Sequence, residues 1–337
     1  MSMDTSAPLI SVVLPAYNAA ATLPEAVESI LAQTWRHLEL LIIDDGSTDE
    51  TAAVLARFRD DRLRHVRRPH LGLVAALNHG LQLARGEFIA RMDADDRSHP
   101  HRLATQLELL RHHSECAAAG CLVEMFPENE VQGGMRRYVE WLNGLRTPEA
   151  IRHNLFVEMP LLHPSMLLRA AAIRTAGGYR SGDFPEDYDV LLRLHCAGWQ
   201  FIKAPAVLYY WREHPARLSR TSPAYRPEAF LAVKVKYLLQ TYLHDERLFC
   251  IGGAGRDGKR LCRALMQAGQ RPVAFLDIDP RKIGQRVYGI PVLNAEAAQK
   301  STGLVLVCVG AAGARALIRE ALLHRGFCEG DDFVCLA

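Results

Sequence analysis

The amino-acid sequence predicts an α/β protein with a mostly parallel central sheet, followed by a second, smaller α/β unit. Two observations support this fold class. Apolar strand-like segments alternate with amphipathic helix-like segments from residue 9 onward, and the same alternation starts again near Arg247. The chain of 337 residues is too long for one ordinary core, and its 49% of hydrophobic residues is sufficient for two. We therefore expect a first domain over 1–226, a linking helix over 227–246 and a second domain over 247–337.

The first strand is expected over Leu9–Leu14, because a continuous apolar run is typical of buried parallel strands, and we expect it to end at Pro15. A helix with one apolar face follows, and then a second buried strand over Leu38–Ile43 and another helix. Polar loops follow the carboxyl ends of both strands, where open α/β sheets bind ligands. Capping boxes are expected to begin the two helices, Thr22 with Glu25 and Ser47 with Glu50.

The remaining elements follow from the same patterns. In the first domain, strands are expected over 63–66, 87–92, 117–123, 165–169 and 201–211, with helices over 72–84, after 100 and over 187–197. In the second domain, strands are expected over 248–251, 273–276, 304–309 and 332–334, with helices after 258 and over 314–325. Strands that alternate with helices predict a compact Rossmann-like α/β domain at this end.

Composition narrows the classes of protein. A net charge of +2 gives no indication of a nucleic-acid partner. The eight cysteines are scattered without a CxxC or Cys/His zinc pattern, which is typical of reduced thiols. The N-terminus is polar up to Pro8, and the longest uncharged stretch, Ser301–Ala314, is too short to span a bilayer. We expect a cytoplasmic protein, with peripheral association with the inner face of the membrane left open.

Three motifs carry the functional information. They are SVVLPAYNAA with LLIIDDGSTDE in residues 11–50, ARGEFIARMDADD at Ala84–Asp96 and PEDYDVLLRLHCAGW at Pro185–Trp199. Each motif alone is a weak signal, but together and in this order they resemble the family 2 glycosyltransferases. Those enzymes have the GT-A fold and pass a sugar, with inversion, from a nucleotide sugar to an acceptor hydroxyl. The resemblance fades after about Ser222 and does not cover the second domain.

The resemblance implies a divalent metal, Mn²⁺ or Mg²⁺, at the acidic cluster. Asp95 matches the metal ligand, and Asp93 matches a residue that contacts the ribose or the water shell of the metal. Such a hard cation takes oxygen ligands and neutralises the charge that builds on a diphosphate leaving group. His214 follows an aromatic and basic stretch, as does a metal-binding histidine in several relatives; a surface-loop histidine is the alternative. Asp96 is expected to cap the next turn, and a solvated acidic turn is the alternative for the whole cluster.

The resemblance also implies a nucleotide site. Pro15, Tyr17, Asn18 and Asp45 match the positions that bind the base of the donor. A carboxylate can accept the imide N–H of uracil or thymine and an aromatic ring can stack on the base, so a UDP- or dTDP-sugar is the favoured donor. Arg68 lies where a basic residue could reach the base or the phosphates.

The pair Glu186-Asp187 matches the ED motif of the family. An inverting transfer needs a base that takes the proton of the acceptor, and Asp187 is expected in this role, with Glu186 positioning the acceptor. The alternative is a helix-start carboxylate favoured by the helix dipole, and both can hold. Residues 125–160, with Tyr138 and Trp141, have two equally weighted interpretations: an acceptor-binding wall, or a surface helix with packed aromatic residues.

A second glycine-rich loop lies in the C-terminal domain. Gly253, Gly255 and Gly258 follow a strand and open a helix, and Asp277 ends the next strand, which is the context of a dinucleotide-binding fingerprint. This domain resembles the small nucleotide-binding domains of sugar-modifying acyltransferases and dehydratases. It is short and lacks a second mononucleotide-binding half, so a second nucleotide site and a purely scaffolding role both stay open.

The sequence therefore predicts a metal-dependent inverting glycosyltransferase whose acceptor is a cell-surface glycan or a lipid-linked precursor. One alternative is a sugar-nucleotide pyrophosphorylase, but its glycine-rich, basic triphosphate loop is missing after the first strand. Another alternative is a non-catalytic nucleotide-sensing or regulatory protein, against which Asp95 and Asp187 count. Self-association is left open. Since the catalytic motifs precede residue 227, we expect a chain that ends near Tyr242 to fold and stay active.

Overall fold

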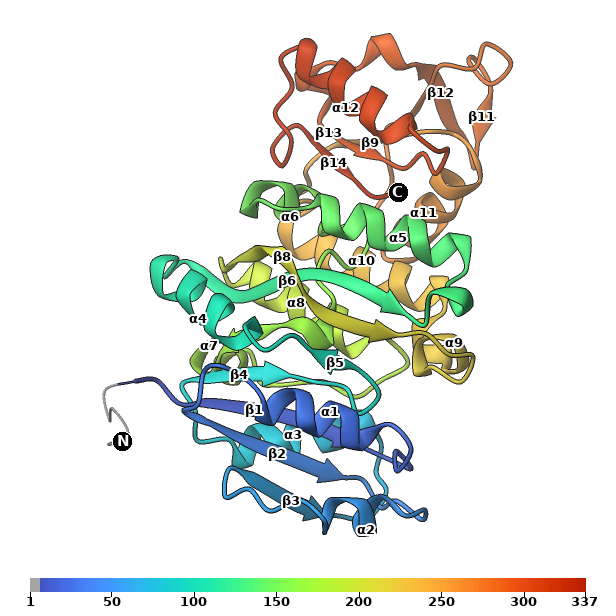
Figure 1. Cartoon of the computed structure of the whole chain (residues 1–337). Coiled ribbons are helices and arrows are strands. Elements are labelled where there is room, and N and C mark those ends of the chain that lie inside the picture. The colour runs from blue at the N-terminus through green and yellow to red at the C-terminus, as the bar shows by residue number, and fades with distance from the viewer. Residues whose placement is uncertain (1–6) are drawn as a thin grey trace. The chain divides into compact units, whose positions relative to one another are not determined.

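The computed structural model describes residues 7–337, and the first six residues of the polar N-terminus lie outside this part. The chain packs as two compact units (Figure 1). The first unit comprises residues up to 151 and residues 160–224, and the second comprises residues 152–159 and 225–337. The predicted linking helix belongs to the second unit, as does an eight-residue segment from the middle of the first domain.

The first unit contains an eight-stranded mixed sheet in the order β3-β2-β1-β4-β7-β6-β8-β5. Its strands are β1 (Ile10–Ala16), β2 (Leu38–Asp44), β3 (Leu63–Arg67), β4 (Phe88–Arg91), β5 (Arg97–Ser98), β6 (Cys116–Phe126), β7 (Leu167–Arg169) and β8 (Gln200–Arg212). Its helices are α1 (Leu23–Leu31), α2 (Thr51–Leu55), α3 (Leu73–Leu83), α4 (Arg102–His112), α5 (Gly133–Gly144), α6 (Pro148–Asn154, whose last residues belong to the second unit), α7 (Ala170–Thr175), α8 (Glu186–Cys196) and α9 (Leu218–Thr221). Short 3₁₀ turns are η1 (Glu128–Glu130), η2 (His163–Ser165) and η3 (Pro223–Tyr225).

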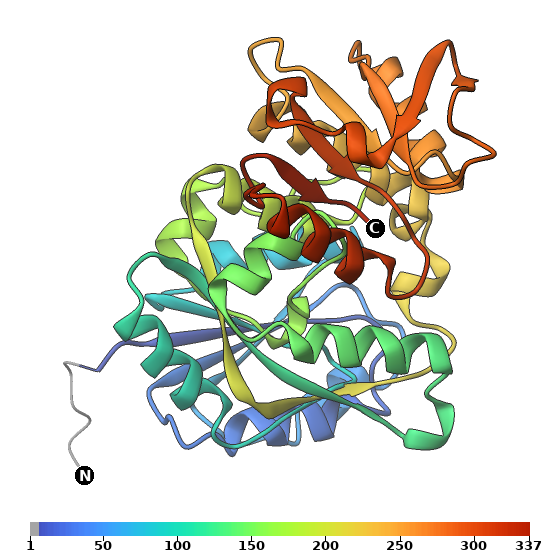
Figure 2. The same cartoon turned by 90° about the horizontal axis from the view of Figure 1, so that it is seen from above.

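The sheet is parallel where the nucleotide site is expected. Strands β3, β2, β1 and β4 are parallel neighbours, and β6 pairs with β8 in parallel as well. The short strand β7 runs antiparallel between β4 and β6, and β5 runs antiparallel to β8. Helices lie on both sides of this sheet in Figures 1 and 2. The loops after β1, β2 and β4 therefore leave the sheet at one edge.

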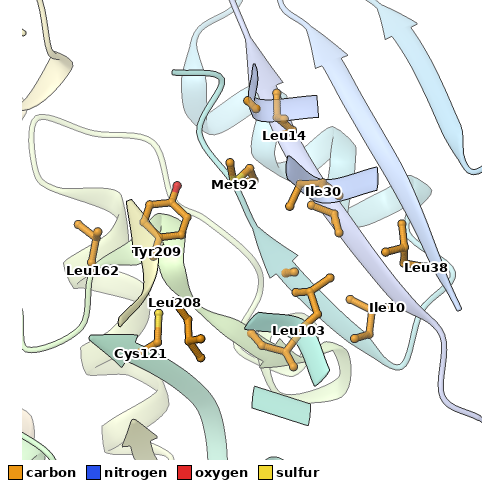
Figure 3. Packing of buried hydrophobic residues seen from close by; sticks show 14 of the residues in the cluster. Ile10, Leu14, Ile30, Leu38, Met92, Leu103, Cys121, Leu162, Leu208 and Tyr209 are labelled. Carbon is orange, nitrogen blue, oxygen red and sulfur yellow. The ribbon is translucent and has the colours of Figure 1, made fainter. Parts of the chain in front are cut away.

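The pleat of β1 explains why its apolar run is continuous. Alternate residues of a strand point to opposite faces of the sheet. Ile10, Val12 and Leu14 pack in one cluster with the buried face of α1, whereas Val13 lies against α3, where a Cβ on Gly80 would approach Val13 Cγ1 to 2.4 Å. Figure 3 shows part of this cluster, with Tyr209 of β8 among its members. A strand covered on both faces needs apolar residues at every position.

Several local expectations were wrong because distant partners compete for the same side chains. Thr22 makes no side-chain cap on α1, and Glu25 instead forms an ion pair with Arg97 (3.2 Å) and another with Arg212. Ser47 accepts the N–H of Asn18 (2.9 Å) rather than capping a helix. In addition, β1 continues through Pro15, and the N–H of Thr51 in α2 is accepted by Asp49 (3.0 Å) rather than by a capping box.

The second unit contains a six-stranded sheet in the order β11-β12-β10-β9-β13-β14. All neighbouring strands are parallel except β11 and β12, an antiparallel hairpin that the sequence analysis did not identify. The elements are α10 (Pro227–Thr241), β9 (Phe249–Gly252), α11 (Arg256–Gln267), β10 (Ala274–Asp277), β11 (Arg286–Val287), β12 (Ile290–Asn294), η4 (Ala295–Ala297), η5 (Lys300–Thr302), β13 (Leu304–Val307), α12 (Ala314–His324) and β14 (Phe333–Cys335). No helix in residues 7–337 is long and apolar enough to cross a bilayer.

Residues 152–159 are held inside the second unit by apolar and polar contacts. The ring of Phe156 packs edge-on against Tyr242 at 5.5 Å between centroids, and the Lys234 ammonium donates to the carbonyl of Val157 (2.6 Å). His153 lies 3.4 Å from Glu329, which Arg319 binds through two nitrogens. The chain therefore leaves the first unit at Ile151, contributes to the core of the second unit, and returns at Pro160.

Candidate active site

The loops after β1 and β2 are tied together, and this positions the nucleotide-site candidates. The N–H of Asp45 donates to the carbonyl of Ala16 (2.8 Å), and the side-chain oxygen of Asn18 accepts the N–H of Thr48 (2.8 Å). Asn18 adopts a left-handed backbone with φ of 49°, a conformation that asparagine tolerates better than most residues. Asn18 therefore fixes the shape of this loop.

The Asp45 carboxylate is buried and anchors the loop after β3. It accepts the N–H groups of Leu71 (3.1 Å) and Gly72 (2.8 Å), forms an ion pair with Arg68 (3.3 Å) and lies 2.8 Å from the His70 Nδ1 atom. The backbone of Gly46 lies close to that of His70. Its φ is +80°, and a Cβ at this position would lie 2.7 Å from the backbone nitrogen of His70. The predicted pair Asp45 and Arg68 is thus brought together in one cluster.

Tyr17 presents an aromatic surface at the same place. Its side chain is half exposed, and its ring stacks on that of His70 with 4.0 Å between centroids and an interplanar angle of 22°. The sequence analysis missed His70, because a histidine in a polar loop carries no local signal. Pro15, by contrast, is buried within β1 rather than in the loop, so its contribution is to the strand.

Three carboxylates converge in the loop after β4. The ligand oxygens that Asp93, Asp95 and Asp96 offer lie within 4.8 Å of one another. About a third of the Asp93 and Asp95 side chains is exposed, whereas Asp96 is buried. Burial and the neighbouring Asp93 charge raise the pKa of Asp95, which reflects the repulsion within the cluster.

Asp96 has a different role from the one expected. Rather than capping the next turn, its carboxylate accepts the hydroxyl of Tyr209 and the backbone N–H of Arg212, each at 2.7 Å. Burial and the charges of Asp95 and Asp93 raise the pKa of Asp96 well above its ordinary value. Asp96 therefore fastens the acidic loop to β8, an interaction across more than a hundred residues that no local pattern predicts.

The donor set fits a hard divalent cation. Carboxylate oxygens are the ligands that Mg²⁺ and Mn²⁺ prefer, and a cation would relieve the mutual repulsion of these three groups. The His214 Nε2 atom lies 2.8 Å from the Asp95 carboxylate, so the structure brings this predicted ligand to the cluster. The Arg212 guanidinium donates to the Asp95 carbonyl (2.6 Å) and holds the same loop. Asp95 and Asp93, with His214 beside Asp95, are the side chains that could hold such an ion.

The second carboxylate pair begins helix α8. Glu186 is buried, and Asp187 is half-buried with its carboxylate accepting the N–H of Tyr188 (2.7 Å). Burial and, to a smaller degree, the charge of Glu186 raise the pKa of Asp187 to about 8. A carboxylate with a raised pKa is a stronger base once ionised, so this environment suits proton abstraction.

The helix that carries this pair is fixed by a buried ion pair. The Arg193 guanidinium lies 2.8 Å from Asp189 one turn away, and it also donates to the carbonyls of Ala176 and Gly178. Residues Gly177-Gly178 lead into Tyr179, whose hydroxyl is hydrogen-bonded to His163 (2.7 Å). This network ties α8 to the loop that precedes it, and the sequence analysis missed all its members.

The aromatic residues of the less regular stretch pack rather than open to solvent. Tyr138 and Trp141 of α5 are partly buried against the first core, and Tyr138 lies 6.3 Å from Trp211 between ring centroids. Their packing supports the interpretation of a covering helix over that of an acceptor wall.

The glycine-rich loop of the second unit joins β9 to α11. A Cβ on Gly258 would lie 1.9 Å from the Gly253 carbonyl, so the loop folds tightly onto the helix. Asp277 ends β10, and its carboxylate accepts the N–H groups of Ala254 (2.8 Å) and Asp279 (2.9 Å) and binds Lys282 (3.0 Å). These three donors keep the pKa of Asp277 below its ordinary value although burial opposes the shift. Asp277 thus closes the loop within its own domain.

Comparison with known proteins agrees with this geometry. The model of glycosyl transferase family 2 matches residues 11–175. EpsE of Bacillus subtilis, which is named as a glycosyltransferase, is 32% identical over 251 residues, covering 71% of this chain and 87% of EpsE. An uncharacterized glycosyltransferase of Haemophilus influenzae is 32% identical over 232 residues, covering 66% of this chain and 69% of that protein.

Two solved structures share the fold. The mannosyltransferase PcManGT from Pyrobaculum calidifontis, in complex with GDP-Man and Mn²⁺, has a TM-score of 0.51 at 23% identity, covering 70% of this chain and 63% of that one. S. aureus TarS 1–349, in complex with UDP-GlcNAc, has a TM-score of 0.55 at 18% identity, covering 76% and 71%. With the family model, the relatives and the mixed sheet in agreement, the chain belongs to glycosyltransferase family 2 and has the GT-A fold.

Proposed function

We propose that this glycosyltransferase moves a sugar from a nucleoside diphosphate donor to an acceptor hydroxyl, with inversion and with the help of Mn²⁺ or Mg²⁺. The proposal rests on one observation: the domain contains two carboxylate sites with different environments. A partly exposed acidic cluster with His214 suits a cation, and Asp187, a carboxylate outside that cluster whose pKa is raised to about 8, suits a proton acceptor. These are the two functions that a one-step displacement requires.

In this reaction the oxygen of the acceptor hydroxyl attacks the anomeric carbon as the bond from that carbon to the diphosphate oxygen breaks. The hydroxyl proton goes to the Asp187 carboxylate, and the bonding electrons leave with the nucleoside diphosphate. When bound, the cation supplies positive charge for that leaving group. Glu186 is proposed to orient the acceptor, and Asp95, Asp93 and His214 to hold the cation.

The donor is proposed to be a UDP- or dTDP-sugar. The half-exposed ring of Tyr17 offers a stacking surface for the base. Asp45, which is buried and already accepts two backbone N–H groups and pairs with Arg68, is proposed to shape this site from beneath. Of the two structural neighbours, one was solved with GDP-Man and the other with UDP-GlcNAc, so a guanine nucleotide is the competing class. A cell-surface glycan or a lipid-linked precursor is the proposed acceptor, with the reaction on the cytoplasmic side of the membrane.

Three further assignments accompany this proposal. We propose that the transferase domain spans 1–226, that 227–246 links it to a Rossmann-like domain over 247–337, and that Gly253, Gly255 and Gly258 with Asp277 are the place to look for a second nucleotide. The closure of Asp277 on its own loop favours the scaffolding alternative.

A thermal-shift and hydrolysis screen tests the function. UDP-, dTDP- and GDP-sugars are compared with and without Mn²⁺, because a ligand that binds the folded state raises the apparent Tm by mass action. We expect one nucleotide class to stabilise the protein only with the cation and to be hydrolysed slowly without an acceptor. Equal behaviour in EDTA, or no effect of any donor, would contradict the proposal.

A further inference from the structure

A buried arginine lies beneath the acidic cluster. Arg91 is the last residue of β4 and is 3% exposed, an unusual place for a guanidinium unless charged partners surround it. Its Nη2 atom lies 2.7 Å from the Asp93 carboxylate. Its backbone is fixed as well, since its N–H donates to the Met166 carbonyl (3.0 Å) and its carbonyl accepts from the buried Arg102 (3.1 Å).

The same arginine acts on the other carboxylate site. Its charge opposes the rise in the pKa of Asp187. Together with burial, which has the larger effect, the Arg91 charge also lowers the pKa of His163 well below its ordinary value. The neutral His163 ring is hydrogen-bonded to the Tyr179 hydroxyl. Burial raises the pKa of Tyr179, and the charges of Glu186 and Asp187 raise it further.

The residues around Arg91 are held in place from outside the site. The Asn78 side chain donates to the Tyr179 carbonyl (2.8 Å) and accepts its N–H (2.9 Å), which fixes Tyr179 on α3. Arg102 also donates to the Pro164 carbonyl (3.1 Å) beside His163. The guanidinium therefore lies in a rigid environment that reaches from β4 toward the start of α8.

Resting on the proposed function, we infer that Arg91 is a positioning residue for the transfer: its buried guanidinium holds the Asp93 carboxylate of the acidic cluster by a direct ion pair. Arginine suits this role because its guanidinium stays charged in proteins and offers several fixed donors.

Two substitutions separate the charge of Arg91 from its planar donors. Arg91→Lys keeps the charge and loses the planar donors, whereas Arg91→Met loses both. Arg169→Lys is the matched control: Arg169 pairs across the sheet with Phe88 of the same strand β4, and its guanidinium donates to the carbonyls of Cys116 and His113.

The experiment uses the full chain. Hydrolysis of UDP-GlcNAc, GDP-mannose and dTDP-glucose by the wild type is measured first, and the donor hydrolysed fastest is used for all variants. The Mn²⁺ concentration for half-maximal rate and the Tm with and without Mn²⁺ are measured for each variant. We expect both Arg91 variants to need at least about tenfold more Mn²⁺, for the rate and for the rise in Tm, because the Asp93 carboxylate is no longer held in place.

Arg169→Lys should change the Tm and leave the Mn²⁺ requirement at the wild-type value. Folded Arg91 variants with the wild-type Mn²⁺ requirement would overturn the inference. If Arg91→Met does not fold, the Mn²⁺ requirement of Arg91→Lys against that of Arg169→Lys decides it. A wild-type chain that hydrolyses none of the three donors would instead refute the proposed function.

Discussion

The acidic loop follows β4 and Asp277 ends β10, so both carboxylate sites lie at the carboxyl end of a strand with a parallel neighbour, yet they differ in what their carboxylates already bind. Asp93 and Asp95 keep about a third of their side chains exposed, and they repel each other. Asp277 is buried and holds two backbone N–H groups and a lysine. The comparison teaches that a motif at the end of a strand marks a place where a ligand can bind. Whether a ligand can bind there depends on how many hydrogen bonds the carboxylates can still accept after their protein partners are counted.

The largest effect is expected at the open site. Asp95→Ala should abolish cation-dependent donor binding and turnover, because the cluster loses its central ligand, while the fold survives since this side chain is partly exposed. Donor hydrolysis with and without EDTA measures this, with circular dichroism as the control for folding. Wild-type turnover in the variant would show that the open carboxylates bind no essential ion.

A loss of at least about a hundredfold in kcat is expected for Asp187→Asn, which keeps the shape and removes the base. Donor affinity should hardly change, because the acceptor proton is what this group receives. Steady-state kinetics together with donor titration separate the two quantities. If instead the donor bound weakly and kcat were preserved, Asp187 would belong to the donor site.

The pH dependence sharpens the same assignment. Under the proposed role of Asp187 as the base, its ionised form is the active one, so kcat/KM should rise with pH and level off above about 8, the raised pKa of this carboxyl. A bound cation and donor add charge nearby, so the limb of kcat is expected at a different pH from that of kcat/KM. Asp187→Asn should remove the limb, and its persistence would assign it to another group.

Truncation tests how separable the two units are. A chain ending near Tyr242 was expected to fold, but Leu155, Phe156 and Met159 are buried in the second unit and would be exposed by its removal. We now expect such a chain to be destabilised. Phe156→Ala in the full chain should lower the free energy of unfolding by about 3 kcal/mol, the lower end for a buried phenylalanine. Denaturant unfolding measures it, and a wild-type midpoint would contradict this packing.

The smallest effect is expected at the closed site. Asp277→Asn should destabilise the second unit by about 2 kcal/mol, the scale of hydrogen bonds to a charged group. Because its pKa is depressed in the folded state, its stabilisation is present above the ordinary aspartate pKa and is lost on acidification below it. Donor turnover should change less than about twofold, as expected for independent sites. Calorimetry with NAD and UDP-sugars checks whether the loop binds a nucleotide.

The amino-acid sequence by itself determined where three carboxylates of this protein lie relative to its strands and helices. Apolar runs and glycines at turns are local signals, and they located Asp45 just after β2, Asp95 in the loop after β4 and Asp187 in the first turn of α8. The resemblance supplied their roles, since composition and spacing carry no information about a sugar. The arginine in the apolar run FIARM, residues 88–92, is a local signal that the sequence analysis did not use. A charged side chain in a buried strand requires partners, so its position indicates a polar cluster nearby.

Only the tertiary structure decided which side chains meet. The contacts of Asp96 with Tyr209, of Asp95 with His214 and of Tyr179 with His163 join residues that are far apart along the chain or lie in different elements. Pairing across such separations depends on sheet order and register, which local periodicity does not specify. The same reason explains why Glu25 pairs with Arg97 instead of capping helix α1. It also explains why residues 152–159 belong to the core of the second unit. In both cases burial and charge pairing across the fold outweigh local preference.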